Sequence, residues 1–167
     1  MDKSTLVLEN PLWDYVTTLY GNKRLQGLLL EWQDNVGVNI NVVLFMLWLA
    51  EQRKVMDEGQ IDVIESAIES LHHSFVLPLR ALRRRAAAHC DSATSPWLMS
   101  KKKILDAEIQ AEQMVIATLY AWSIDCTSEA TDLDIDSLKQ HNLSTYLQQF
   151  SSLPSISATT LLQRLAR

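Results

Sequence analysis

Two glutamates and a run of arginines are the residues of this chain best suited to chemistry. Glu108 and Glu112 lie four residues apart in AEIQAEQ, a spacing that places both carboxylates on one face of a helix. The same face carries the apolar residues of the segment, so both carboxylates are expected to point inward. A buried carboxylate without a partner is very costly, so each must be protonated, bind a metal or pair with a cation.

The obvious cations are four arginines that fall within six residues, at positions 80, 83, 84 and 85. On the helix that carries them, Arg83 lies beside the apolar stripe and Arg85 faces away. Arg83, and with it Arg80, is therefore expected to reach the two glutamates. Two interpretations stay open. The cluster is either a structural ion pair that fixes how two helices pack, or the wall of a pocket for an anion or a polar ligand.

A polar turn precedes the most apolar part of the chain. Gln33, Asp34, Asn39 and Asn41 run directly into the nine apolar residues 42–50. Polar groups beside a buried helix need hydrogen-bond partners, so these side chains are expected to meet partners from distant parts of the chain. Asn39 is also the expected N-cap of the apolar helix.

Motifs for metals, cofactors and known catalytic mechanisms are weak or missing. Glu69 and His72 have the ExxH spacing of di-iron bundles, but such a site needs two pairs and only one is present. Asp132, Asp134 and Asp136 imitate the start of a calcium loop, which then lacks its glycine and its final glutamate. No nucleophile elbow, P-loop or dinucleotide-binding glycine motif occurs. No metal, no cofactor and no catalytic residue is predicted.

The elements that position these residues are predicted to be helices. Capping residues and the spacing of apolar positions indicate helices over about 11–20, 23–35, 42–50, 59–88, 96–122, 135–141, 144–150 and 157–166. Pro78 is expected to kink or break the fourth near Val76, giving two shorter helices in tandem. Polar residues 89–95 form a predicted turn and residues 125–134 an acidic loop. No strand pattern persists, so the fold class is all-α, a single-domain bundle of about six to eight helices.

Composition sets the class of molecule. A length of 167 residues suits one domain, and the net charge of -5 argues against wholesale nucleic-acid binding. The longest apolar run, residues 42–50, is far shorter than the roughly 20 residues that span a bilayer. The N-terminus lacks the pattern of a signal peptide. Cys90 and Cys126 have no metal or disulfide spacing. A soluble, cytoplasmic protein with reduced thiols and no membrane partner is expected.

Several motifs resemble those of a proteobacterial family of uncharacterised small helical proteins. The matching segments are NPLW, LEWQDNVGVNINVVLFMLWLA, VLPLRALRRR and AEIQAEQ, against the family patterns LQDxxGxDVNLLLFxxWLA, PLRxxRR and AELxAEQ. The resemblance covers about residues 10–122 and leaves the acidic loop and short helices of 125–167 unmatched. It brings no known activity. It singles out Trp13, Gln33, Asp34, Gly37, Asn41, Phe45, Trp48, Arg80, Arg84, Glu108 and Glu112. Asn39 stands where the family has aspartate, which weakens acid–base chemistry there.

Three functional hypotheses follow. The first is a non-enzymatic binding, regulatory or adaptor module that holds a protein partner or a small polar or anionic ligand, and a homo-oligomer is compatible with it. It would use a polar network of Trp13, Gln33, Asp34, Asn39, Asn41, Trp48, Arg80, Arg83, Arg84, Glu108 and Glu112. The second is an enzyme whose carboxylates do acid–base work while an arginine holds an anionic substrate, and a deep pocket joining Glu108, Glu112 and Arg84 would favour it. The third is association with RNA or the ribosome through Arg83–Arg85 and Lys101–Lys103, if their helices pack side by side.

Overall fold

The fold is all-α, as predicted. The computed structural model describes residues 6–90, 95–126, 132–150 and 157–166, and these ranges contain no strand. The α-helices are α1 (Pro11–Tyr20), α2 (Lys23–Val36), α3 (Ile40–Glu51), α4 (Glu58–Leu71), α5 (Leu77–Ala88), α6 (Trp97–Asp125), α7 (Ile135–Leu147) and α8 (Ala158–Leu165). A π-helical turn, η2 (His72–Val76), joins α4 to α5, and a 3-10 turn, η3 (Gln148–Phe150), follows α7.

Helix α3 is the centre of the bundle. Every residue from Ile40 to Ala50 is buried, as expected for a helix that is apolar on all sides. Helices α1, α2, α6 and α7 all pack against it. The local signals at its start act as predicted: Gly37 adopts a left-handed φ of 79° after α2, and Asn39 Oδ1 accepts a hydrogen bond from the backbone N–H of Asn41.

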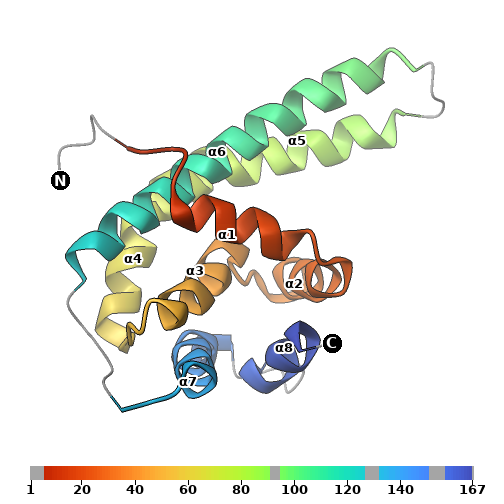
Figure 1. Ribbon diagram of the computed structural model, residues 1–167. Helices are drawn as coiled ribbons and strands as arrows, with labels where there is room; N and C mark the ends of the chain where they lie inside the picture. Colours follow the sequence, from red (N-terminus) through yellow and green to blue (C-terminus); the bar gives the residue numbers. More distant parts are fainter. Residues whose placement is uncertain (1–5, 91–94, 127–131, 151–156, 167) are drawn as a thin grey trace.

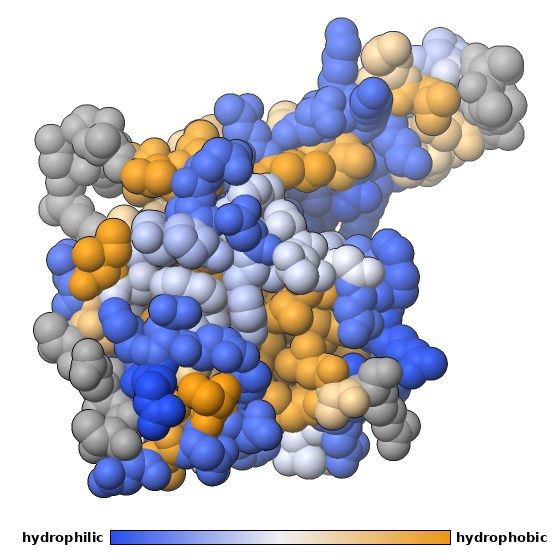
Figure 2. Space-filling model, viewed as in Figure 1, coloured by the Kyte–Doolittle hydropathy of each residue, from blue (hydrophilic) through white to orange (hydrophobic). Residues whose placement is uncertain are grey.

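Helices α5 and α6 form an antiparallel hairpin, which we call the arm. The C-terminal half of α5 and the N-terminal half of α6 extend well beyond the rest of the bundle (Figure 1). Hydrophilic and hydrophobic residues lie next to one another on this projecting part (Figure 2). The side chains of Leu82, Trp97, Leu98 and Met99 are among its exposed apolar groups. The arm therefore carries apolar surface that the bundle itself does not cover.

The prediction for Pro78 is confirmed in part: α4 and α5 are two helices in tandem, but no break separates them. The backbone stays helical from Glu58 to Ala88 because one π-helical turn absorbs the proline. Proline has no N–H and its ring crowds the preceding turn. The chain responds by widening that turn: the N–H of Leu77 donates to the carbonyl of His72, five residues back. The backbone is consequently helical throughout, and the direction of the helix changes between α4 and α5 (Figure 1).

The predicted division of residues 135–150 into two helices is wrong. Helix α7 runs unbroken past the polar residues at its middle and ends in η3. Asn142 does not interrupt the helix because its side chain is used elsewhere. Its Oδ1 accepts from the N–H of Met56 at 3.0 Å, and its Nδ2 donates to the carbonyls of Lys54 at 2.9 Å and Met46 at 3.3 Å. Asn142 therefore fastens α7 to the end of α3 and the loop after it.

Parts of two other predictions fall on residues 91–94 and 127–131, which lie outside the described ranges. They are the turn at 89–95 and the acidic loop at 125–134. Within the described ranges, no helix combines the length and the apolar character needed to cross a membrane.

We expect Asn142→Ala to lower the free energy of unfolding by about 3 kcal/mol, because buried backbone groups that lose their partners cost roughly 1–3 kcal/mol each. Urea unfolding followed by circular dichroism measures this. Asn35→Ala, on the exposed face of α2, is the matched control and should change stability by less than about 0.5 kcal/mol. Equal, small effects of the two substitutions would contradict the role given to Asn142.

Candidate functional site

The arginines and glutamates meet as predicted. Glu108 has a side chain that is only 5% exposed, and it lies between two arginines of the neighbouring helix. Its Oε1 accepts from Arg80 Nε at 3.3 Å and from Arg83 Nη2 at 3.1 Å, and its Oε2 accepts from Arg83 Nε. Glu112 accepts from Arg80 Nη2 at 2.7 Å. Both predicted inward-facing carboxylates are therefore compensated by cations from α5.

This cluster forms one wall of a groove of about 560 Å³, which we call the arm groove. The opposite wall comes from α1 and α2, and its floor includes Ile40, Asn41 and Leu44 at the start of α3. Apolar groups from both sides contribute, among them Leu30 and Leu105. Most of the residues that the sequence singled out line it together: Trp13, Gln33, Asn41, Arg80, Arg83, Arg84, Glu108 and Glu112.

Two amide side chains, those of Asn41 and Gln33, line the arm groove. Asn41 is only 7% exposed, and its carboxamide makes no hydrogen bond within the described residues. The Nε2 of Gln33 is buried and has no hydrogen-bond partner of regular geometry there, although an interaction of the Gln33 side chain with Asp34 contributes to the lowered pKa of that carboxyl. Since buried polar groups are almost always paired, Gln33 Nε2 is the least satisfied buried side-chain atom of the described structure, and Asn41 lines the same groove. A ligand or bound water in the groove would satisfy them.

Asp34 lies outside the groove but restrains it. Its Oδ1 accepts from Arg84 Nη2 at 2.6 Å, which connects the end of α2 to α5. The side chains are 46% and 52% exposed, so the pair contributes at most about 1 kcal/mol of stability. The hydrogen bond from Arg84 lowers the pKa of the Asp34 carboxyl. This exposed ion pair therefore links α2 to the arm.

Glu112 and Tyr20, which both line the arm groove, have raised pKa values. Burial raises the pKa of the Glu112 carboxyl, and the positive charge of Arg80 opposes that rise. Burial raises the pKa of the Tyr20 hydroxyl as well, and the nearby Glu112 carboxylate adds to it. Glu112 is also 28% exposed at its side chain, so it is the more accessible of the two glutamates.

Trp48 and Asn39 do not line the arm groove. Trp48 is buried on α3, where its ring packs against Phe45 at 6.2 Å and Tyr120 at 5.9 Å between ring centroids. It contributes to the core. Asn39 lies on the other side of the start of α3, in a second cleft. Two residues of the predicted network therefore lie elsewhere: Trp48 packs in the core, and Asn39 lines a different cleft.

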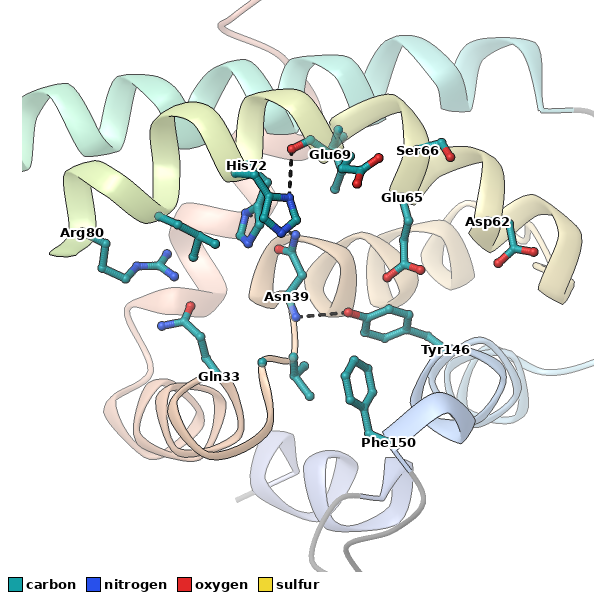
Figure 3. A pocket seen from close by; sticks show the side chains of 15 residues that line it. Gln33, Asn39, Asp62, Glu65, Ser66, Glu69, His72, Arg80, Tyr146 and Phe150 are labelled. Carbon is teal, nitrogen blue, oxygen red and sulfur yellow. Dashed lines mark hydrogen bonds between the residues drawn. The ribbon is translucent and has the colours of Figure 1, made fainter.

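The second cleft, of about 610 Å³, runs along the continuous helix formed by α4, η2 and α5; we call it the α4 cleft (Figure 3). Glu65, Glu69 and His72 come from one wall, and Asn39 and Tyr146 from the other. Gln33 and Arg80 line both hollows. In the sequence, His72 was linked only to an incomplete ExxH motif, and no pattern indicated Glu65 or Tyr146. Two sequence features mark this region: the ExxH spacing of Glu69 and His72, and the segment HHSFVLP, in which Pro78 disturbs the regular helix.

Asn39 organises the α4 cleft. Its backbone N–H donates to the hydroxyl of Tyr146 at 3.1 Å (Figure 3). Its Nδ2 lies 3.4 Å from His72 Nδ1. Burial, followed by the charges of Arg80 and His73, lowers the pKa of His72 to about 4. His72 is therefore neutral at physiological pH.

The basic clusters lie on adjacent helices. Arg84 and Arg85 are exposed on α5, and Lys102 and Lys103 are exposed on α6, which packs against it. Association with RNA required the helices that carry the two basic clusters to pack side by side, and they do. The association itself stays a prediction. For metals, the described residues contain no group of three histidine, cysteine, aspartate or glutamate side chains that could hold an ion.

The two glutamates should respond differently to neutralisation. Glu108→Gln leaves Arg80 and Arg83 without a carboxylate between them, so we expect a loss of roughly 3 kcal/mol or more, as when a buried ion pair is broken. Glu112→Gln should cost less, about 1 kcal/mol, because Arg80 keeps its contact with Glu108 and the Glu112 side chain is 28% exposed. Urea unfolding of both variants at pH 7 measures this. Equal losses would show that Glu112 is needed as an anion.

His72 should make the fold sensitive to acid. Because its pKa falls from 6.5 to about 4 on folding, its stabilising effect is complete above pH 6.5 and is lost as the pH falls toward 4. We expect an NMR titration of the ring to show a midpoint near pH 4. The free energy of unfolding should also fall less steeply over this range in His72→Gln than in the unsubstituted protein. A ring that titrates near its ordinary pKa would contradict this.

One comparison with known proteins gives a match. The family model described as a protein of unknown function (DUF2390) matches residues 11–119, which contain α1 to α5 and most of α6. No curated protein and no solved structure matches the chain. The matched range includes Trp13, Arg80, Arg83, Glu108 and Glu112 of the arm groove. The chain belongs to this family of proteins of unknown function, DUF2390.

Proposed function

We propose that this protein is a cytoplasmic, non-enzymatic binding module whose arm groove holds an anionic group of a ligand or protein partner. The observation that carries the proposal is an open groove lined by arginines, in which the amide Nε2 of Gln33 is buried without a partner of regular geometry and the carboxamide of Asn41 lies beside it. A purely structural ion-pair network needs no such groove beside it. A volume of about 560 Å³ also falls within the range of roughly 300–1,000 Å³ that small-molecule sites occupy.

The charges of the groove select an anion. Four cationic side chains line it, Lys23, Arg80, Arg83 and Arg84, against the two carboxylates Glu108 and Glu112. Both carboxylates are already bonded to arginines, whereas the carboxamide of Asn41, which has no hydrogen bond within the described residues, can donate to a ligand oxygen. The apolar side chains of Trp13, Leu30 and Leu105 favour a ligand with a hydrophobic part. The preferred ligand is therefore an organic anion, or an acidic side chain, with an apolar neighbour.

An enzyme acting on a small anionic substrate is the second candidate. The specific observation in its favour is that Glu108, Glu112 and Arg84 line one groove. Burial raises the pKa of the Glu112 carboxyl, which suits general acid–base work. Opposing this, Arg80 holds Glu112 at 2.7 Å and restricts its access to a substrate proton. In a binding module, Glu112→Gln should bind an anion at least as tightly as the unsubstituted protein, because a negative charge is removed.

The first test is native mass spectrometry of the gently purified protein, compared with its denatured mass. We expect extra mass that is lost on denaturation. Because the natural ligand is unidentified, phenylacetate serves as a defined probe, with neutral phenylacetamide as its control. At a concentration about ten times its Kd, phenylacetate should raise the Tm by a few degrees, which corresponds to about 1.4 kcal/mol of added stability.

Matched arginine variants identify the groove as the binding site. Arg83→Gln removes a groove cation, whereas Arg85→Gln removes an exposed cation from the same helix outside the groove. The Tm shift by phenylacetate should disappear in Arg83→Gln and persist in Arg85→Gln, with circular dichroism showing that both variants are folded. A bare native mass together with equal shifts by phenylacetate and phenylacetamide would contradict the proposal and leave the cluster as a structural element.

A further inference from the structure

The π-helical turn gives the α4 cleft a continuous polar wall. In a uniform α-helix, each residue turns the chain by about 100°, so Arg80 would lie roughly 80° away from His72. A π-helical turn accommodates one extra residue, so the eight positions from His72 to Arg80 complete about two turns. His72 and Arg80 therefore share one face with Glu65 and Glu69, and all four line the cleft.

The hydrogen bonds of Asn39 determine which N–H and O–H groups of the α4 cleft can donate to a ligand. The Oδ1 of Asn39 accepts from the N–H of Asn41, so its Nδ2 is the atom that meets His72 Nδ1. A nitrogen that accepts carries no proton, so the proton of His72 is on Nε2. The hydroxyl of Tyr146 accepts from Asn39 N–H and keeps its own hydrogen to donate. Neither donor has an acceptor in the described part of the chain.

The two ends of the cleft carry opposite charge. Arg80 lies at one end and Asp62 at the other, with Glu65 and Glu69 between Asp62 and His72 (Figure 3). Arg80 is bonded to Glu108 and Glu112, so it acts on the cleft through its charge. A ligand that satisfies this arrangement is anionic beside His72 and cationic beside Glu65.

The length of the cleft defines the ligand further. Glu65 and His72 are seven residues apart on a helix, which places their Cα atoms about 10 Å apart. Three residues of extended peptide span about the same distance, at roughly 3.3–3.6 Å each. Between the charged ends, Phe150 gives the cleft apolar surface, and Val38 and Ile68, which are almost fully buried, also line it.

We propose that the α4 cleft binds a short extended peptide of about three residues, with its terminal carboxylate at His72 Nε2 and Tyr146 Oη and its terminal ammonium at Glu65. This site is separate from the arm groove and does not depend on the function proposed for that groove. The two hollows share Gln33 and Arg80, whereas His72, Tyr146 and Glu65 belong to the cleft alone.

The test uses trialanine titrated into the full-length protein, followed by 1H–15N NMR shifts of cleft residues. N-acetyl-trialanine lacks the ammonium, and trialanine amide lacks the carboxylate. We expect each blocked peptide to bind at least about tenfold more weakly than free trialanine, because hydrogen bonds to charged groups contribute roughly 1.5–3 kcal/mol. Single alanine, which cannot reach both ends, should also bind more weakly. No binding of trialanine, or equal binding of the three peptides, would overturn the proposal.

Two variants test which terminus of the peptide lies at Glu65 and which lies at Tyr146. Glu65→Gln should weaken free trialanine about tenfold and leave N-acetyl-trialanine unchanged, because that peptide has no ammonium to lose. Glu31→Gln, an exposed carboxylate of α2 outside both hollows, is the matched control and should change neither. Tyr146→Phe should weaken trialanine but not trialanine amide. If Tyr146→Phe unfolds the protein, Glu65→Gln still decides, since its equal effect on both peptides would refute the assigned orientation.

Discussion

Helix α3 is apolar on every side, so the chain must enclose it on every side. Helices α1, α2, α6 and α7 do so along its length, but its first turn presents a different problem. A helix N-terminus carries backbone N–H groups that need acceptors, and burying it requires polar residues inside the protein. Asn39 supplies one such acceptor, because its Oδ1 accepts from the N–H of Asn41. The two hollows of the molecule lie on either side of this start, one lined by Asn39 and the other by Asn41.

The arm depends on a second constraint, that buried charges must be paired. Glu108 and Glu112 on α6 are compensated by Arg80 and Arg83 on α5, so these side chains fix how the two helices pack. A buried ion pair adds little net stability, because removing the charges from water offsets most of their attraction. Breaking it is costly, which makes the cluster a means of specifying the hairpin. One edge of the cluster still faces an open groove, and a purely structural pair does not require that.

The sequence predicted those features that depend on local chemistry or on simple helical spacing. The Asn39 cap, the left-handed Gly37 and the inward direction of Glu108 all follow from such rules, and the structure agrees. Features that depend on distant contacts or on irregular geometry were not predictable. Tyr146 lies 107 residues from its partner Asn39. The π-helical turn changes the angle per residue, so a uniform wheel misplaces Arg80 relative to His72. From the sequence, Asn142 is expected to end a helix, and only its contacts with the loop after α3 explain why α7 continues through it.

Arg80 connects the two hollows electrostatically. Glu108 and Glu112 hold its guanidinium in place, so it cannot move toward a ligand in either hollow, and its charge acts on both. An anion in the arm groove partly neutralises that charge and weakens the attraction felt by a carboxylate beside His72. By thermodynamic reciprocity, a carboxylate in the α4 cleft weakens binding of an anion in the groove by the same factor. On the two proposals made for these hollows, the fixed arginine makes their occupation mutually unfavourable without any change of shape.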